Sequence, residues 1–352
     1  MQEIELKFQI PARSLAAVQT ELAGLPGGKA PAQTLQAAYF DTADRKLAQA
    51  HAALRVRQED ADWVQTLKAA GPNAMTRLED NRASPAFGPG TVIAPDLSLH
   101  QSPEVRQALV RDLGWQPDQD PPGRQLGLVQ LYGTDMRRTR AQVTVGQGTA
   151  FEGVLELALD LGQIKAGSLS EAVRELEIEL VSGHPMAVID AGRDWVRRHG
   201  LWLDTQTKAH RGDRLAWQAA LAGTADAAGA QGGHVTPAKP PKVAADATPR
   251  QIWQARLESC LAHITGNLSE LGTAPADVAP VALEWRAALQ GLMAFASAWA
   301  GTPHALPAEI LALAKSLDQQ LGQVSPTSTV ALARSGAASE LCLDLLACLM
   351  AD

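Results

Sequence analysis

Residues 1–10 read MQEIELKFQI, in which charged and apolar residues alternate. Successive side chains of a β-strand point to opposite faces, so Glu3, Glu5 and Lys7 share one face of the predicted strand. The opposite face is apolar and carries Ile4, Leu6, Phe8 and Ile10. One such strand usually lies at a surface with its charges in water, so the alternation becomes informative only if other strands repeat it.

The same alternation recurs in the strands that we expect farther along the chain. Basic residues form such rows in four segments, with Arg55 and Arg57 in ALRVRQ, Lys68 in WVQTLK, Arg77 in MTRLEDN and Arg138 in TDMRRTRAQV. Acidic residues form such rows in two further segments, with Asp160 in VLELALDLG and Glu175, Glu177 and Glu179 in RELEIEL. Because helices need an aliphatic sheet face to pack on, the charged faces are expected to point inward.

An inward charged face has a chemical consequence. If the sheet closes into a barrel, its interior becomes a polar tunnel instead of a packed core. Charges of both signs are costly to bury unless they are paired or bound to a ligand. Lysine and arginine bind phosphate oxygens, and carboxylates bind hard divalent cations such as Mg²⁺ or Mn²⁺. The pattern therefore favours a polyanion that a divalent metal ion bridges to the carboxylates.

The first 218 residues alternate strand-like and helix-like segments. This predicts an α+β unit, an antiparallel sheet or barrel with helices outside. Ser102 before Pro103 predicts a helix start, and Gly114 predicts its end. Another helix is expected over residues 185–199.

The rest of the chain divides into two parts. Residues 219–249 are rich in Ala, Gly, Pro, Thr and Lys and have no hydrophobic period, so they are predicted to be a linker. Residues 250–352 contain several stretches with helical periodicity and are predicted to form an all-α helical bundle. A chain of 352 residues is long enough for two such domains.

Composition limits the class of protein. The net charge of −7 argues against a general nucleic-acid coat, so any anion site must be a local group of cations. The N-terminus has no signal-peptide pattern, and no uncharged apolar run is long enough to span a bilayer, so we expect no membrane partner. The three cysteines, an odd number, predict no disulfide framework and favour the cytoplasm.

Taken in order, these motifs resemble the CYTH superfamily, the triphosphate tunnel metalloenzymes. The motifs that carry the resemblance are ExExK at 3–7, YFDT at 39–42, LRVR at 54–57, TLK at 66–68, ALD at 158–160, ExExE at 175–179 and TKAHRG at 207–212. Together they span roughly residues 1–215. The resemblance implies an eight-stranded antiparallel β-barrel tunnel with helices outside, which agrees with the alternation.

The resemblance also implies roles for individual residues. The metal ligands for Mg²⁺ or Mn²⁺ would be Glu3, Glu5, Asp160, Glu175, Glu177 and Glu179. The substrate-binding cations would be Lys7, Arg55, Arg57, Lys68, Arg77, Arg138 and Lys208. Lys7 and Glu5 would be catalytic, with Lys7 at the bond that is cleaved. Arg140 shares a face with Arg138 and could exchange roles with it, whereas Arg211 is expected to be solvated.

The shared residues bind triphosphate and metal, so they leave the reaction open among inorganic triphosphatase, thiamine triphosphatase and class IV-type adenylate cyclase. The segments VTVGQ, GQIKAG and ELEIELVSG are similar to the bacterial inorganic triphosphatases, which favours hydrolysis of tripolyphosphate to pyrophosphate and phosphate. A non-catalytic polyphosphate or nucleotide sensor is an alternative of a different class. The many carboxylates argue against it, because a pure anion binder gains nothing from them.

Residues 250–352 resemble a reduced CHAD domain, a helical module that accompanies many members of this superfamily. The region is shorter than that module, and its acids outnumber its cations. We therefore expect scaffolding or self-association from it, without polyphosphate binding. An apolar face left exposed after the helices pack would allow a homodimer.

Overall fold

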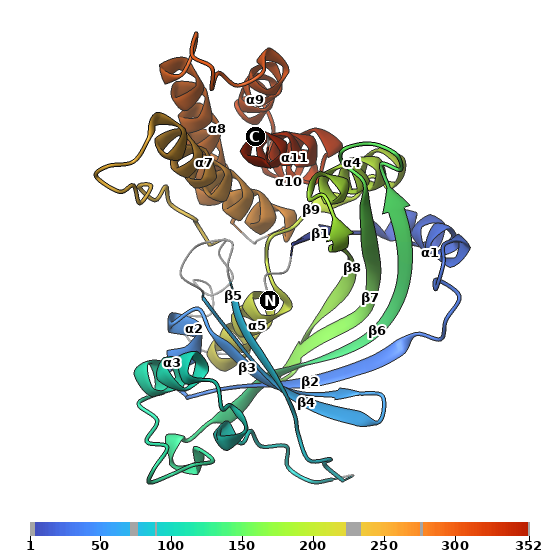
Figure 1. The fold of residues 1–352 in the computed structure, drawn as a ribbon, viewed down its shortest axis with the longest axis vertical. Helices are drawn as coiled ribbons and strands as arrows, with labels where there is room; N and C mark the ends of the chain where they lie inside the picture. Colours follow the sequence, from blue (N-terminus) through green and yellow to red (C-terminus); the bar gives the residue numbers. More distant parts are fainter. Residues whose placement is uncertain (1–3, 71–76, 89, 223–233, 275–276, 351–352) are drawn as a thin grey trace.

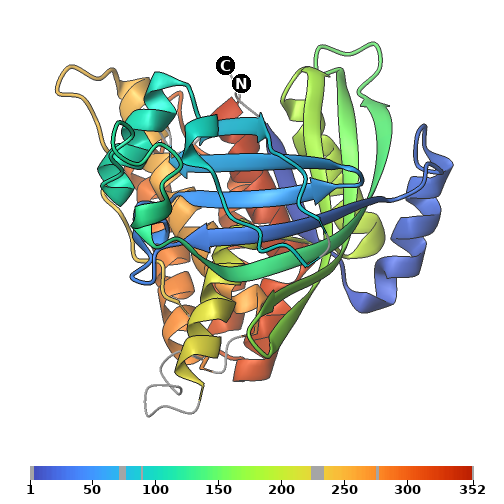
Figure 2. The same ribbon diagram turned by 90° about the horizontal axis from the view of Figure 1, so that it is seen from below.

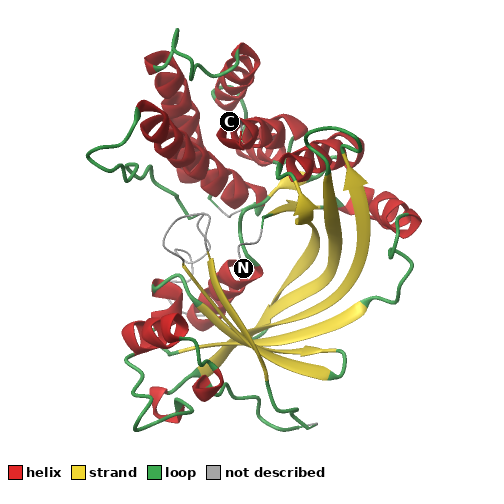
Figure 3. Cartoon of the chain, in the orientation of Figure 1, coloured by secondary structure: helices red, strands yellow, loops and turns green. Residues whose placement is uncertain are grey.

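A computed structural model describes residues 4–70, 77–88, 90–222, 234–274 and 277–350 (Figure 1). The chain forms a strongly curved antiparallel sheet and two sets of helices, one around the sheet and one at the C-terminal end (Figure 3). The predicted α+β class, with an antiparallel sheet followed by helices, is confirmed.

The sheet has nine strands among the described residues, in the order β5-β4-β3-β2-β6-β7-β8-β1-β9, and every pair is antiparallel. The bounds are β1 Glu5–Gln9, β2 Gln33–Asp41, β3 Ala53–Glu59, β4 Asp62–Ala70, β5 Arg77–Ala83, β6 Val129–Val145, β7 Gly153–Ala166, β8 Leu169–Gly183 and β9 Trp202–Leu203. The two-residue β9 extends the eight longer strands beyond β1. Figure 2 shows β6, β7 and β8 bending away from the plane of β2, β3 and β4.

The helices around the sheet are α1 Leu15–Gly24, α2 Lys46–Gln49, α3 Pro103–Leu113, α4 Met186–His199 and α5 Lys208–Leu221. Three short 3₁₀ helices, η1 Ala12–Ser14, η2 Leu97–Leu99 and η3 Arg124–Leu126, lie in the connections. The expected start and end of α3 are confirmed, because the Ser102 side chain accepts a hydrogen bond from Val105 N and Gly114 is left-handed. Helix α4 ends before Gly200, as the sequence predicts.

The outer face of the sheet is apolar, as the alternation predicts. Phe8 on β1 and Leu176 and Ile178 on β8 are fully buried in one core with residues of α4. A second core lies beneath α3 on the outer side of β3 and β4, where Leu54 and Val56 are fully buried. With these faces covered, the charged residues of the same strands point to the concave side.

Helix α5 lies inside the curve of the sheet and contacts β6, β7 and β8 (Figure 1). Gly212 makes this close approach feasible, because a Cβ there would lie 2.2 Å from Cδ2 of Tyr132 on β6. No hydrogen-bonded pair joins β5 to β9 within the described ranges. Helices α5 and α7 contribute the wall on that side of the cavity described below.

The C-terminal helices are α7 Pro249–Gly272, α8 Ala279–Ala298, α9 Ala308–Leu321, α10 Pro326–Ala333 and α11 Gly336–Met350. Helix α7 begins at a capping box, in which Thr248 and Gln251 satisfy each other's backbone N–H groups. The core of this bundle is continuous with the core beneath α4. None of the described helices is both long and apolar enough to cross a bilayer.

The described end of the predicted linker at residues 219–249 packs against α7. Helix α5 continues to Leu221, and residues 234–248 are described. Thr236 exchanges two hydrogen bonds with the Asn267 side chain, and His234 N donates to Glu270 at 2.9 Å. The division into residues 1–218, 219–249 and 250–352 stays a prediction.

Candidate active site

The strand register brings the charged rows side by side on the concave face. Between β1 and β8, Glu5 pairs with Glu179, Lys7 with Glu177 and Gln9 with Glu175. Glu175 is in turn beside Asp160 on β7, and Asp160 is beside Arg138 on β6. Residues far apart in the sequence thus form one continuous charged surface.

Asp160, Glu175 and Glu177 form a compact carboxylate cluster. One oxygen from each lies within 4.8 Å of the other two. Asp160 is 1% exposed and Glu175 is fully buried, so their charges need close partners. The Lys208 ammonium is such a partner, at 2.8, 2.6 and 2.8 Å from Asp160, Glu175 and Glu177. The Lys208 ammonium therefore lies at the centre of the three acids.

The cations around this cluster keep its acids ionised. Burial alone would raise the pKa of Glu175, but Lys208, Lys7 and Arg211 outweigh it and lower that pKa to about 2. Burial also opposes ionisation of Glu177, whose pKa is nonetheless lowered, chiefly by Lys208 and Arg138. The pKa of Lys208 is raised well above its usual value, because the three carboxylates outweigh the effect of burial.

Arg138 holds the carboxylates from the β6 side. Its Nε and Nη2 donate to the two oxygens of Asp160, both at 2.6 Å, and Nη2 also lies 2.5 Å from Glu177. Burial alone would lower the pKa of Arg138, but Asp160 and Glu177 raise it. Such bidentate contacts fix the orientation of both partners.

The opposite wall is basic and comes from β3 and β4. Lys68 pairs with Glu79 at 2.7 Å, and Arg57 pairs with Glu59. Arg55 contacts the Tyr39 hydroxyl at 3.4 Å. Burial and the adjacent charge of Arg55 lower the pKa of Arg57, as expected where two guanidinium groups lie close together.

Two buried donors on these walls have no hydrogen-bond partner among the described residues. They are Nζ of Lys7 and Nε of Arg55. Lys7 Nζ lies 3.8 Å from Glu175, beyond hydrogen-bonding distance. Unsatisfied buried donors are costly, so both atoms suit an anionic ligand that would accept their hydrogen bonds.

These walls enclose a cavity of about 940 Å³, which we call the tunnel cavity. The predicted site residues that line it are Glu5, Lys7, Arg55, Arg57, Lys68, Arg138, Asp160, Glu177, Glu179 and Lys208. Glu175 lies at its carboxylate cluster. Glu3 and the side chain of Arg77 lie outside the described residues. Arg140 does not share the position of Arg138, because it pairs with Glu156 at 3.0 Å away from the cavity lining.

The structure corrects one expectation and adds one residue. Arg211 is not solvated: it is 3% exposed and forms ion pairs with Glu171 at 2.7 Å and with Glu175. Gln9, which the sequence interpretation omitted, donates to Glu175 and to Asp204, both at 2.8 Å. Gln9 continues the period-two row of β1, so the alternation itself was a usable signal.

The sequence profile of the CYTH domain matches residues 1–212, which is more than half of the chain. The chain belongs to the CYTH domain family. In this CYTH protein the matched residues include all of the described strands, which build the concave charged face, and helices α1 to α4, which pack on the apolar outer face.

The CYTH protein is also similar to individual proteins. It is 27% identical over 220 residues to an inorganic triphosphatase from Haemophilus influenzae, and the match covers 60% of this chain and 54% of that protein. The chain thus spans about half the length of the curated relative. A putative adenylate cyclase from Bacillus halodurans gives 20% identity and a TM-score of 0.36, covering 59% of this chain and 96% of that one. A putative adenylyl cyclase from Hippeastrum gives 21% identity and a TM-score of 0.39, and the match covers 60% of this chain and 96% of that one.

Proposed function

We propose that this CYTH protein is a metal-dependent triphosphatase that hydrolyses tripolyphosphate to pyrophosphate and phosphate. One observation carries the proposal: a buried carboxylate cluster faces a basic wall across one cavity, and buried donor atoms of Lys7 and Arg55 have no hydrogen-bond partner among the described residues. Membership of the CYTH family and similarity to an inorganic triphosphatase support hydrolysis.

Asp160, Glu175 and Glu177 fit a hard divalent cation, because they offer converging carboxylate oxygens and already surround a positive group. Glu5 and Glu179, in the adjoining row, would complete the ligand set together with Glu3. The cation would be Mg²⁺ or Mn²⁺. When bound, it would neutralise charge on the phosphate oxygens and polarise the phosphorus.

The basic wall would hold the triphosphate chain. Arg55, Arg57 and Lys68 line the cavity and would bind its oxygens, and Arg77 begins the neighbouring strand β5. Arg138 and Lys208 approach from the carboxylate side. Fixed cations of this kind contribute by positioning the substrate and by stabilising charge in the transition state.

Lys7 and Glu5 would act at the bond that breaks. In the reaction, a water oxygen bonds to the terminal phosphorus, the bond from that phosphorus to the bridging oxygen breaks, and pyrophosphate leaves. Glu5 would orient the water and accept its proton. Lys7 Nζ would donate to the phosphate oxygens, which would satisfy its buried donor.

The assay uses the purified full chain with Mg²⁺ or Mn²⁺ and compares tripolyphosphate, thiamine triphosphate and ATP. We expect phosphate release to be fastest from tripolyphosphate. Failure to cleave tripolyphosphate, together with conversion of ATP to cyclic AMP, would overturn the proposal. Binding of tripolyphosphate without any turnover would instead support the sensor alternative.

A single variant tests the carboxylate cluster. Glu177→Gln removes one charge from it while keeping the side-chain shape, and we expect kcat to fall by about a hundredfold or more. Glu156→Gln is the matched control, because Glu156 lies on the neighbouring strand and pairs with Arg140 outside the cavity lining. Equal activity of the two variants would contradict the assigned role.

We also propose that the enzyme works in the cytoplasm. All three cysteines, Cys260, Cys342 and Cys348, are free thiols, which suits a reducing compartment. The CHAD-like nature of the C-terminal helices and a homodimer stay predictions, as do the lack of nucleic-acid and membrane partners.

A further inference from the structure

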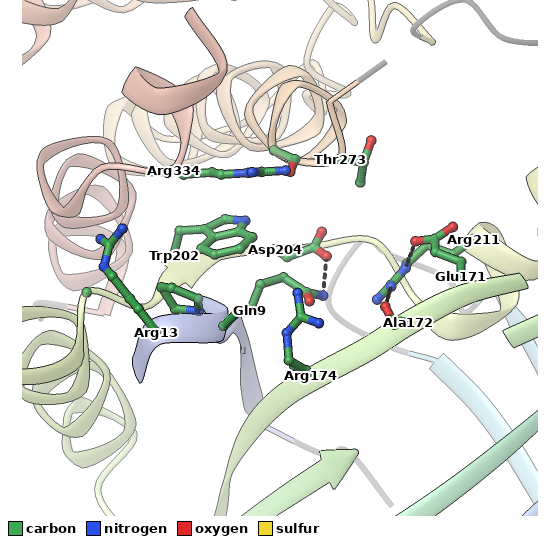
Figure 4. A pocket seen from close by; sticks show the side chains of 14 residues that line it. Gln9, Arg13, Glu171, Ala172, Arg174, Trp202, Asp204, Arg211, Thr273 and Arg334 are labelled. Atoms are coloured by element: carbon green, nitrogen blue, oxygen red, sulfur yellow. Dashed lines mark hydrogen bonds and ion pairs between the residues drawn. The ribbon is translucent and has the colours of Figure 1, made fainter. Parts of the chain in front are cut away.

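A second cavity, of about 460 Å³, lies between the sheet and the C-terminal helices. It is bounded by η1, β8, β9 and the C-terminal ends of α7 and α10 (Figure 4). Its charged lining consists of four arginines and two carboxylates, Arg13, Arg174, Arg211, Arg334, Glu171 and Asp204. We call it the arginine cavity.

Both carboxylates of this cavity already have partners. Glu171 accepts a hydrogen bond from Arg211 Nε at 2.7 Å. Asp204 accepts from the Gln9 side chain at 2.8 Å (Figure 4). It also accepts from Gln206 N at 2.8 Å. Neither carboxylate compensates any of the other three arginines by an ion pair.

Arg334 is held in place without an ion pair among the described residues. Its guanidinium stacks over the Trp202 ring, 5.1 Å from the centroid, and its Nε donates to Gly272 O at 2.8 Å (Figure 4). No carboxylate of the described residues lies within ion-pair distance of it. Burial and the nearby charge of Arg174 lower the pKa of Arg334.

Arg174 and Arg13 add two further cations that form no ion pair with any described residue. Arg174 is half-buried, and its guanidinium makes one long hydrogen bond among the described residues, from Nε to Ile10 O at 3.4 Å. Arg13 is exposed at the rim and likewise has no ion pair within the described part of the chain. Gathering like charges in one cavity is unfavourable unless an anion offsets the repulsion.

We propose that the arginine cavity is a second anion site, which binds a small oxyanion of the phosphate class such as pyrophosphate or orthophosphate. Guanidinium groups bind the tetrahedral oxyanion through paired N–H donors, and Arg334 is preorganised for this by Trp202 and Gly272. Because the protein as a whole carries a net negative charge, its overall composition does not explain this local excess of arginine, which points to an anionic ligand.

The position of the cavity favours phosphate over other oxyanions. Asp204 lines both this cavity and the tunnel cavity, and Gln9 links Asp204 to Glu175 of the carboxylate cluster. Phosphate products released from the tunnel would therefore meet the arginine cavity nearby. This choice of ligand rests on the proposed function, whereas the anion site itself does not.

Calorimetric titration of the full chain with pyrophosphate in EDTA tests the site without turnover. We expect two classes of site in the wild type. Arg174→Gln combined with Arg334→Gln should remove one class, because each charge-assisted hydrogen bond that is removed weakens binding by about tenfold or more. Arg55→Gln combined with Arg57→Gln should remove the other class, in the tunnel cavity.

A matched control separates a built site from diffuse attraction. Arg124 and Arg137 are exposed arginines outside both cavities, so Arg124→Gln with Arg137→Gln removes the same charge. Unchanged pyrophosphate binding in the Arg174/Arg334 variant, or equal weakening in the control, would overturn the site. Sulfate binding as tight as pyrophosphate binding would overturn its assignment to phosphate.

A second readout covers a variant that fails to fold. Because the Trp202 ring stacks against Arg334, pyrophosphate binding should change the fluorescence of Trp202, and Trp202→Phe should abolish that change. An identical response in wild type and Trp202→Phe would count against the site. Tripolyphosphate turnover should persist in the Arg174/Arg334 variant. A wild type that hydrolyses no triphosphate yet binds pyrophosphate here would refute the proposed function alone.

Discussion

At the scale of single residues, Lys208 is the most informative side chain of the site. Its ammonium lies within ion-pair distance of all three acids of the carboxylate cluster. An ammonium group and a divalent cation cannot occupy the same space among these oxygens. A metal ion bound among these three carboxylates would therefore have to displace Lys208, which would then be free to contact the substrate.

Replacement of Lys208 tests this competition directly. Lys208→Met should tighten Mn²⁺ binding to the substrate-free protein by about tenfold, because one positive charge no longer competes for the carboxylates. Mn²⁺ titration followed by electron paramagnetic resonance measures the dissociation constant. Lys165→Met, at an exposed position on β7, is the control and should change nothing. Weaker Mn²⁺ binding in Lys208→Met would mean that Lys208 positions the acids instead.

The sequence predicted on which face of the sheet a residue lies better than it predicted which residues that residue contacts. Period-two alternation identified the inward face of β1, β3, β7 and β8, because the strand itself sets that alternation. It could not reveal that Lys208 contacts three carboxylates, or that Arg211 is buried. Both residues belong to α5, and their neighbours on β8 are set by how the helix docks on the sheet.

At the scale of elements, the docking of α5 depends on Gly212. A Cβ at this position would lie 2.2 Å from the Tyr132 ring. That ring has little freedom to move, because it stacks on Tyr39 with centroids 4.7 Å apart. Any larger residue must therefore shift α5, and with it Lys208 and Arg211.

Gly212→Ala should lower the free energy of unfolding by about 1–3 kcal/mol, the usual cost of overpacking. Urea unfolding measures this change. Gly291→Ala is the control, because its Cβ would meet nothing within 4 Å on the exposed side of α8. The control should be neutral or stabilise by up to about 1 kcal/mol, since alanine favours helix. Equal stability of the two variants would contradict the close contact.

A buried histidine connects β4 and β5 to the segment that follows η2. His100 is fully buried, with Nδ1 2.7 Å from Asp80 on β5 and Nε2 3.0 Å from Gln65 Nε2 on β4. The Gln65 amide also donates to Asp96 O and accepts from Asp96 N, so its nitrogen must face the ring. His100 is therefore neutral, with its proton on Nδ1.

This arrangement predicts a pH dependence of stability. Burial lowers the pKa of His100 below its usual 6.5, and Asp80 opposes this only in part, with Arg82 adding to the lowering. The unfolded chain then binds the proton more readily, so stability falls as pH drops below 6.5 through the lowered value. His100→Gln should remove this contribution. Urea unfolding at several pH values should show that the wild type loses stability relative to His100→Gln as the pH falls. A stability difference that does not change with pH would contradict the prediction.

At the scale of the whole molecule, the C-terminal helices are part of the core of the sheet. Helix α11 packs on α4, and Arg193 and Arg197 of α4 pair with Asp344 and Glu340 of α11 at 2.6 and 2.8 Å. Composition predicted a linker and helical periodicity predicted the C-terminal helices, and the helices are present. Periodicity shows that a helix has an apolar face, but it does not identify the surface that covers that face.

Leu343 on α11 tests whether sheet and bundle unfold together. It is fully buried, and its Cδ2 lies 3.6 Å from the position of a Cβ built at Gly192 on α4. Because the apolar core is continuous across this contact, Leu343→Ala should cost about 2–5 kcal/mol and lower a single calorimetric transition. Leu283→Ala, at a residue that is 70% exposed on α8, is the control and should leave the transition nearly unchanged. Two transitions in Leu343→Ala, one of them at the wild-type temperature, would show that the helices form an independent unit. A single lowered transition would instead mean that the bundle stabilises the same sheet that carries the tunnel cavity.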